Sequence, residues 1–159
     1  MSFREAVAQT PNLETAWRNG LRALRRQDRR HIEAEDPRRL RGSADVDKAL
    51  QRVEPQANRW DFAIAYQHTN VRGEFIYWVE THTGTDQEIE VVRKKHEWLR
   101  NWLAREGRAL SAENFPQEFY WVPSGATAFT KGAKQVKILA QEGIIYTGSI
   151  LRIRNDRAG

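Results

Sequence analysis

The chain of 159 residues suits a single domain with one hydrophobic core, and its 40% apolar and 30% charged residues are typical of globular rather than disordered proteins. It contains no cysteine, which excludes disulfides, thiolate zinc sites and a cysteine nucleophile and fits a reducing, cytoplasmic setting. No apolar stretch is long enough to cross a membrane, and the first residues lack the apolar run of a signal peptide, so neither a membrane protein nor a secreted one is expected.

The first part of the chain is predicted to be helical. After Asn12, a plausible N-cap, apolar residues recur three or four positions apart: Leu13, Trp17, Leu21 and Leu24. A second short helix is expected over Asp28–Glu35. It should end there because a proline, Pro37, disfavours helical backbone in the residue before it. Residues 1–11 and 155–159 lack such a pattern, so we expect them to be loose ends of a single domain that spans residues 1–159.

Two strands joined by a hairpin-length connection follow. Trp60–Gln67 alternates large apolar residues with small or acidic ones, and Glu74–His82 contains a run of aromatic and β-branched residues. Ahead of them, residues 41–50 form a turn that leads into a short helix or strand, with Ser43 or Asp45 as its cap. The hairpin is the clearest structural prediction in the sequence.

The second half alternates helix and strand. A capping-box spacing at Thr85 and Glu88 predicts a long helix that ends near Arg105. The remaining elements are expected over four ranges: strand Glu118–Val122, helix Lys134–Gln141, and strand segments Ile144–Tyr146 and Ile150–Ile153. A hairpin followed by alternating helices and strands predicts an α/β fold, more closely an α+β fold whose mixed sheet has helices on its faces.

An acidic pair is the first candidate for chemistry. If the turn is centred between Asn70 and Val71, Asp61 lies opposite Glu80 on one face of the hairpin, where opposed Cβ atoms are about 5 Å apart. Two carboxylates in a partly apolar setting repel each other and are costly to desolvate. A Mg²⁺ ion would relieve both problems, so the pair predicts a metal site; the alternative is exposed strand ends that pair with arginines.

Lysine is expected beside this pair. On a helical wheel of residues 88–103, Lys95 falls inside the apolar arc, whereas Lys94 falls on the polar side. A lysine that faces the core needs a partner, and the carboxylates of the hairpin could supply one. The alternative is that the stem of Lys95 lies along apolar surface and its ammonium reaches water.

These positions resemble the PD-(D/E)xK nuclease superfamily: Asp61, then Glu80-Thr81-His82 on the next strand, then a helix that carries Lys95. The resemblance implies a restriction-endonuclease-like core, Mg²⁺ held by Asp61 and Glu80, and Lys95 as a catalytic lysine relocated to the helix. Position 82 is histidine where the superfamily pattern has lysine, so His82 is expected to assist catalysis. Asp47 is a candidate third metal ligand. Segments around Arg41, Arg59 and Val79 also resemble a family of uncharacterised bacterial proteins, which implies no activity.

Arginine is concentrated near the N-terminus, and the net charge is +5. Six arginines are predicted to bind nucleic-acid phosphates, on DNA or RNA: Arg18, Arg22, Arg25, Arg26, Arg29 and Arg30. The alternative is a solvated arginine-rich surface. The sequence thus favours a metal-dependent nuclease and leaves open a non-catalytic module that binds nucleic acid or protein, or an enzyme of another class that uses the same pocket.

Overall fold

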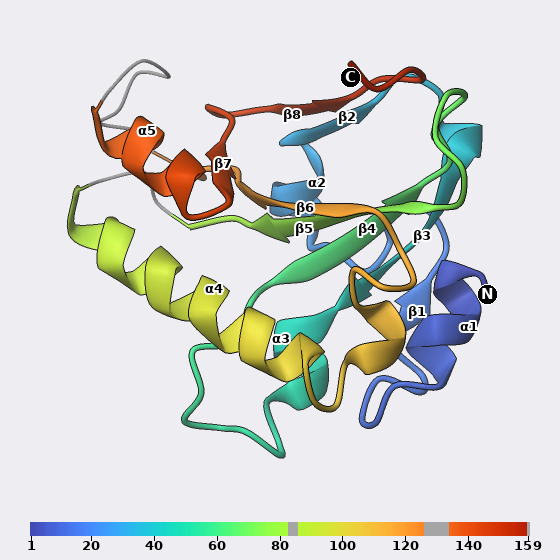
Figure 1. Cartoon of the computed structure of the whole chain (residues 1–159), viewed down its shortest axis with the longest axis horizontal. Helices are drawn as coiled ribbons and strands as arrows, with labels where there is room; N and C mark the ends of the chain where they lie inside the picture. Colours follow the sequence, from blue (N-terminus) through green and yellow to red (C-terminus); the bar gives the residue numbers. More distant parts are fainter. Residues whose placement is uncertain (83–85, 126–133, 159) are drawn as a thin grey trace.

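The computed structural model describes residues 1–82, 86–125 and 134–158, and its centre is a mixed sheet (Figure 1). Among these residues the sheet has six strands, in the order β1 (Trp17–Arg18), β3 (Leu40–Asp45), β4 (Phe62–Tyr66), β5 (Phe75–Glu80), β6 (Gln117–Trp121) and β7 (Ile144–Tyr146). Neighbours from β1 to β5 are antiparallel, whereas β5, β6 and β7 run parallel to one another. The fold is therefore α+β, with the mixed sheet expected from the order of elements.

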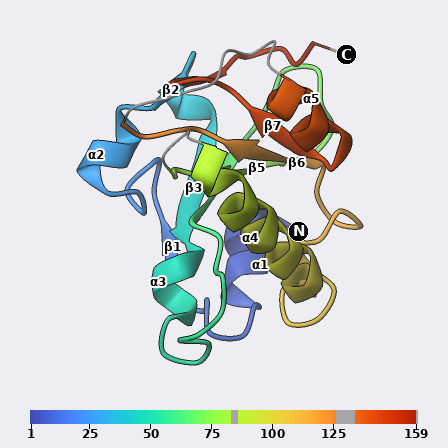
Figure 2. The same cartoon turned by 90° about the vertical axis from the view of Figure 1, so that its left-hand side faces the viewer.

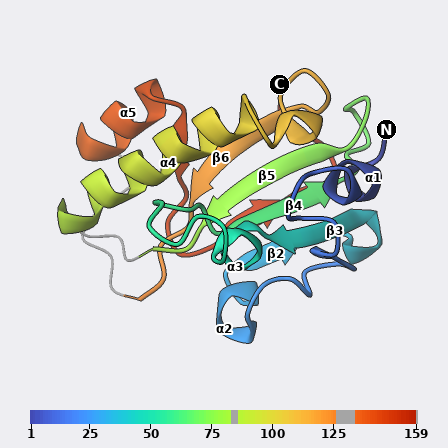
Figure 3. The same cartoon turned by 90° about the horizontal axis from the view of Figure 1, so that it is seen from below.

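Two hydrophobic clusters lie on opposite faces of this sheet because successive strand residues point to opposite sides. On β4, Ala63 and Ala65 belong to one cluster, whereas Phe62, Ile64 and Tyr66 belong to the other. The first cluster includes residues of α1 (Phe3–Ala8), α4 (Ile89–Leu103) and α5 (Lys134–Gln141). Figures 1 and 3 show α4 and α5 side by side across this face.

The second face is covered by strands rather than by a long helix. β2 (Ile32–Ala34) and β8 (Leu151–Ile153) form a separate parallel pair, and Figures 1 and 2 show them stacked on the central sheet. Ile32, Leu151 and Ile153 pack there against the aromatic residues of β4 and β5. The predicted strand Ile150–Ile153 exists, but it belongs to this small sheet.

Residues 3–8 and 155–157 are tied into the fold, in contrast to the loose ends expected there. Helix α1 has a capping box between Ser2 and Glu5, and Phe3 is fully buried. At the other end, the Asn155 N–H donates to Glu35 Oε1 at 2.7 Å, and the Arg157 N–H donates to Asn70 Oδ1 at 2.8 Å. Each end is held by residues distant in sequence.

The helix predicted over residues 12–24 is also wrong. Asn12 has a positive φ of 71°, and the segment consists of turns around β1. Leu13 and Leu24 are both buried, but in the clusters on opposite faces of the sheet. The helix predicted over Asp28–Glu35 is instead α2 (Arg26–Arg29) followed by β2. Apolar spacing here reflects two cores rather than one helical stripe.

The remaining predictions agree more closely with the structure. Asp45 caps α3 (Val46–Leu50), and the helices of residues 89–103 and 134–141 are present. The predicted cap Thr85 lies outside the described residues. The part of the chain that the structure describes also contains three 3₁₀ turns: η1 (Pro37–Arg39), η2 (Asp86–Glu88) and η3 (Arg108–Leu110). Among the described residues, no helix has the length and apolar character needed to cross a membrane.

Candidate functional site

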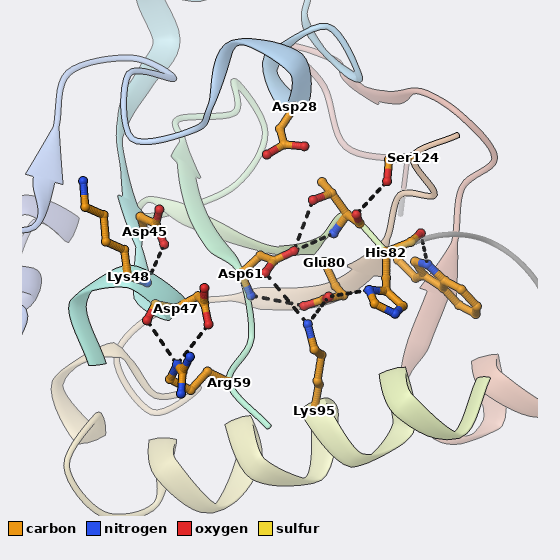
Figure 4. Close-up of polar contacts among 12 residues, drawn as sticks. Asp28, Asp45, Asp47, Lys48, Arg59, Asp61, Glu80, His82, Lys95 and Ser124 are labelled. Atoms are coloured by element: carbon orange, nitrogen blue, oxygen red, sulfur yellow. Dashed lines mark hydrogen bonds and ion pairs between the residues drawn. The ribbon is translucent and has the colours of Figure 1, made fainter. Parts of the chain in front are cut away.

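The candidate site lies where β4 begins and β5 ends. The β4–β5 ladder pairs Phe62 with Val79, and continuing this register places Asp61 beside Glu80, as the hairpin predicted. The Asp61 backbone N–H donates to Glu80 Oε1 at 3.2 Å (Figure 4). Because β5 and β6 are parallel, both carboxyl ends meet at this edge, the usual place for ligands in open sheets of this kind.

Lys95 reaches the pair from α4. Its Nζ lies 2.6 Å from Glu80 Oε2 and 3.9 Å from Asp61 Oδ1. Its side chain is only 17% exposed, whereas Lys94 is on the exposed side of the helix. The helix phase thus selected the correct lysine, and the alternative in which its ammonium reaches water is not what the structure shows.

The charges at this site are unbalanced. The Glu80 side chain is fully buried, and burial, followed by repulsion from Asp61, raises the pKa of its carboxyl well above the usual range. Burial also disfavours the charged form of Lys95, but attraction to Glu80 and Asp61 outweighs it, so the pKa of Lys95 is raised. One ammonium therefore faces two carboxylates, and a further proton or cation is needed to neutralise them.

Thr81 orients Asp61, a role that sequence reasoning missed. Its backbone N–H and its hydroxyl both donate to Asp61 Oδ2, at 3.0 and 3.1 Å. Ser124, which follows β6, donates from its hydroxyl to the Thr81 carbonyl at 2.9 Å. The other carboxylate oxygen of Asp61, Oδ1, is the one that faces Lys95. A threonine directly after the second acid was the only sequence signal for this support.

His82 lies at the rim of the site, between two acids. Its Nε2 is 2.5 Å from Glu88 Oε2, and its Nδ1 is 4.0 Å from Glu80 Oε2. The side chain is one-third exposed, at 33%, so a bound molecule can reach it. Glu88 is a second residue whose part in the site the sequence did not indicate.

Asp47, the predicted third metal ligand, does not join the acidic pair in this structure and pairs with Arg59 instead. Its Oδ1 accepts from Arg59 Nε at 2.9 Å, and the side chain is 43% exposed (Figure 4). The reason is local: α3 begins directly after β3 and directs Asp47 toward Arg59. In residues 1–82, 86–125 and 134–158, three or more potential metal-binding side chains do not gather at any one point.

Three of the six predicted nucleic-acid-binding arginines, Arg18, Arg22 and Arg25, line one cleft. Its volume is about 610 Å³, and Asp45 and Lys48 also line it. The other three, Arg26, Arg29 and Arg30, are exposed on and after α2 and are not among the lining residues.

Comparison with known proteins adds no family to this description. No protein-family model matches the chain, and no curated protein or solved structure matches it.

Proposed function

We propose that this chain is a metal-dependent nuclease with a restriction-endonuclease-like core that hydrolyses phosphodiester bonds of DNA or RNA. The observation that carries the proposal is the convergence of Asp61, Glu80 and Lys95 from two hairpin strands and the following helix. The same arrangement underlies the resemblance to the PD-(D/E)xK superfamily. A mixed sheet with the site at the carboxyl ends of β5 and β6 supports the proposed core.

The donor set fits Mg²⁺. This ion binds through one or two carboxylates and keeps waters and substrate phosphate as its other ligands, so a third protein acid is not required. Asp61 Oδ1 and Glu80 Oε2 both approach the Lys95 ammonium, and their surplus negative charge favours a cation there. A bound Mg²⁺ would supply Lewis-acid polarisation of the phosphoryl group and a more acidic water.

The chain's own residues then divide the work. Asp61 and Glu80 would hold the metal, and Thr81 fixes the orientation of Asp61. The Lys95 ammonium would stabilise the charge that develops on the phosphate or position the attacking water. His82 is exposed enough at the rim to pass a proton toward the leaving oxygen, and Glu88 orients its ring.

The test is cleavage of labelled DNA and RNA by the purified chain with Mg²⁺ or Mn²⁺. Lys95→Met should reduce the rate by about 100-fold or more, since it removes a charge used in the transition state. Lys94→Met is the matched control, because Lys94 is adjacent in sequence but exposed. Unchanged cleavage in an Asp61→Ala, Glu80→Ala double variant would contradict the proposal.

A second candidate is a non-catalytic module that keeps this fold and binds nucleic acid or protein. The complete burial of Glu80 against Lys95 favours it, because the carboxylate already accepts a hydrogen bond from a protein cation at 2.6 Å. This module would bind nucleic acid with an affinity that falls as salt rises, and no metal would induce cleavage. Lack of any nucleic-acid binding near physiological salt would point to a protein partner instead.

A further inference from the structure

The cleft beside the candidate site is strongly basic. Four cationic side chains line it: Arg18, Arg22, Arg25 and Lys48. Asp45 is the acidic residue among its lining. They come from separate segments, the turns around β1 and the first turn of α3. Lys48 was missed by the sequence analysis because it lies outside the arginine-rich stretch.

The cleft and the candidate site are built on neighbouring residues of β3, α3 and the start of β4. Asp45, in the cleft, pairs with Phe62 in the β3–β4 ladder, and Phe62 directly follows Asp61. The first N–H of α3, from Val46, donates to the Asp61 carbonyl at 3.0 Å. Figure 4 shows Asp45 and Lys48 on the side of Asp61 opposite to Lys95. The cleft therefore adjoins the segment that carries Asp61, although Asp61 is not among its lining residues.

Arg25 lines the cleft and also interacts electrostatically with Asp61 of the candidate site. Its Nε is 3.0 Å from Oδ2 of Asp28, whose side chain is only 4% exposed, so the guanidinium is fixed at its inner end while much of it faces the cleft. The hydrogen bond to Asp28 raises the pKa of Arg25, and the nearby charges of Asp61 and Asp45 add to this effect. An arginine that is fixed by Asp28 and lines the cleft can hold a phosphate through charge-assisted hydrogen bonds.

The dimensions favour one strand over two. At about 610 Å³ the cleft is comparable with pockets that enclose small ligands, which span about 300–1,000 Å³. The acids are also recessed, since Asp61 is 16% exposed and Glu80 is fully buried. A duplex is stiff and costly to bend, whereas a single strand can follow a narrow path to a recessed site.

We propose that the cleft binds the sugar–phosphate backbone of a single nucleic-acid strand and directs it to Asp61. This inference rests on the proposed function and names its substrate class: unpaired strands rather than duplex. Arg18, Arg22 and Lys48 contact successive phosphates, and Arg25 contacts the phosphate nearest to Asp61. Phosphate contacts do not distinguish one base from another, so binding tolerates different base sequences. They also use a backbone feature that DNA and RNA share.

Binding is measured by fluorescence anisotropy in EDTA, so that the result does not depend on metal or cleavage. The probes are labelled single strands of DNA and of RNA, about 12 nucleotides long, and the matching duplexes. The test variant is Arg18→Ala, Arg22→Ala, Lys48→Ala. Its matched control is Arg52→Ala, Arg72→Ala, Arg105→Ala, which removes the same charge from exposed positions outside the cleft. Thermal melts verify that both variants fold.

We expect single strands to bind more tightly than duplexes, and the cleft variant to lose about tenfold or more in affinity at about 0.1 M salt. The slope of log affinity against log salt should become shallower by about 2, because each single-strand phosphate contact contributes about 0.7. The control should bind nearly as the unmodified chain does. Preference for duplex, or equal losses in both variants, would overturn the inference. Normal strand binding without metal-dependent cleavage would leave the cleft in place and contradict the nuclease proposal alone.

Discussion

The two faces of the central sheet bury ionisable groups in different ways. On the face covered by β2 and β8, Arg157 pairs with Glu118 and donates to the Tyr77 hydroxyl at 3.0 Å, and it lies 4.2 Å over the Phe75 ring. His68 contacts the Tyr77 hydroxyl and the Asn155 carbonyl through its two ring nitrogens, at 2.7 and 3.2 Å. Burial raises the pKa of Tyr77 to about 12, so its hydroxyl stays protonated. Charges and hydrogen bonds balance on this face.

The helix-covered face is less well satisfied. Two carboxylates share Lys95 there, and His96 is buried with a lowered pKa of about 4, because burial and then Arg100 disfavour its charged form. Among the described residues, His96 Nε2 and Trp60 Nε1 are buried without a hydrogen-bond partner. Unsatisfied buried polar groups cost stability, so they are expected where a function uses them. We infer an architectural role for the first face, and the proposed function gives the second face a chemical role.

The largest expected effect tests the architectural face. Arg157→Met should lower the free energy of unfolding by about 3–4 kcal/mol, because it leaves Glu118 without its cation and Tyr77 without a donor. Urea denaturation measures this loss. The control is Arg154→Met, an exposed arginine three residues earlier in the same segment. Equal losses in both variants would show that Arg157 is not a structural anchor.

The next effect concerns His96 on the other face. Its pKa is about 4 when folded and 6.5 when unfolded, so the unfolded chain binds more protons between these values. The contribution of neutral His96 to stability is present above pH 6.5 and is lost as pH falls toward 4, up to about 3 kcal/mol. Carboxylates titrate in the same range, so the measurement is the difference in pH dependence between the unmodified chain and His96→Leu. Parallel curves would contradict the assignment.

How much of this contrast the sequence could predict depends on the range of the interactions. The hairpin register and the phase of α4 are local periodicities, and they placed Asp61, Glu80 and Lys95 correctly. The missed helix α1 had a local signal too, the Ser2–Glu5 capping box, but only six helical residues behind it.

Long-range packing explains what the sequence did not show. Leu13 and Leu24 have helical spacing, yet they pack in clusters on opposite faces, which only the tertiary fold reveals. The Arg157 network joins residues 80 and 37 positions apart, at Tyr77 and Tyr120. Asp47 was a candidate metal ligand because the sequence does not show its partner. Its pairing with Arg59 depends on how the connection after α3 folds back.

A third prediction compares the two faces directly. Asp61→Asn, Glu80→Gln, Lys95→Met should leave the chain as stable or raise the free energy of unfolding by about 1–2 kcal/mol, because no buried charge is left unpaired. Thermal and urea unfolding measure the change, and cleavage should be lost. The matched double variant Arg157→Met, Glu118→Gln should instead lower stability, since Tyr77 still loses its donor. If neutralisation destabilises both faces equally, the surplus charge at the site is structural.

The smallest expected effect belongs to Asp47. Asp47→Asn should change cleavage by less than about threefold and stability by less than about 1 kcal/mol, because a half-exposed ion pair contributes little. Asp61→Asn, measured in the same Mg²⁺ titration, is the reference and should lower the rate by about 100-fold or more. A large loss of Mg²⁺-dependent activity from Asp47→Asn would mean that Asp47 leaves Arg59 when metal and substrate bind. The candidate site would then be a three-acid centre that forms only on binding. It would include α3 as well as the helix-covered face of the sheet.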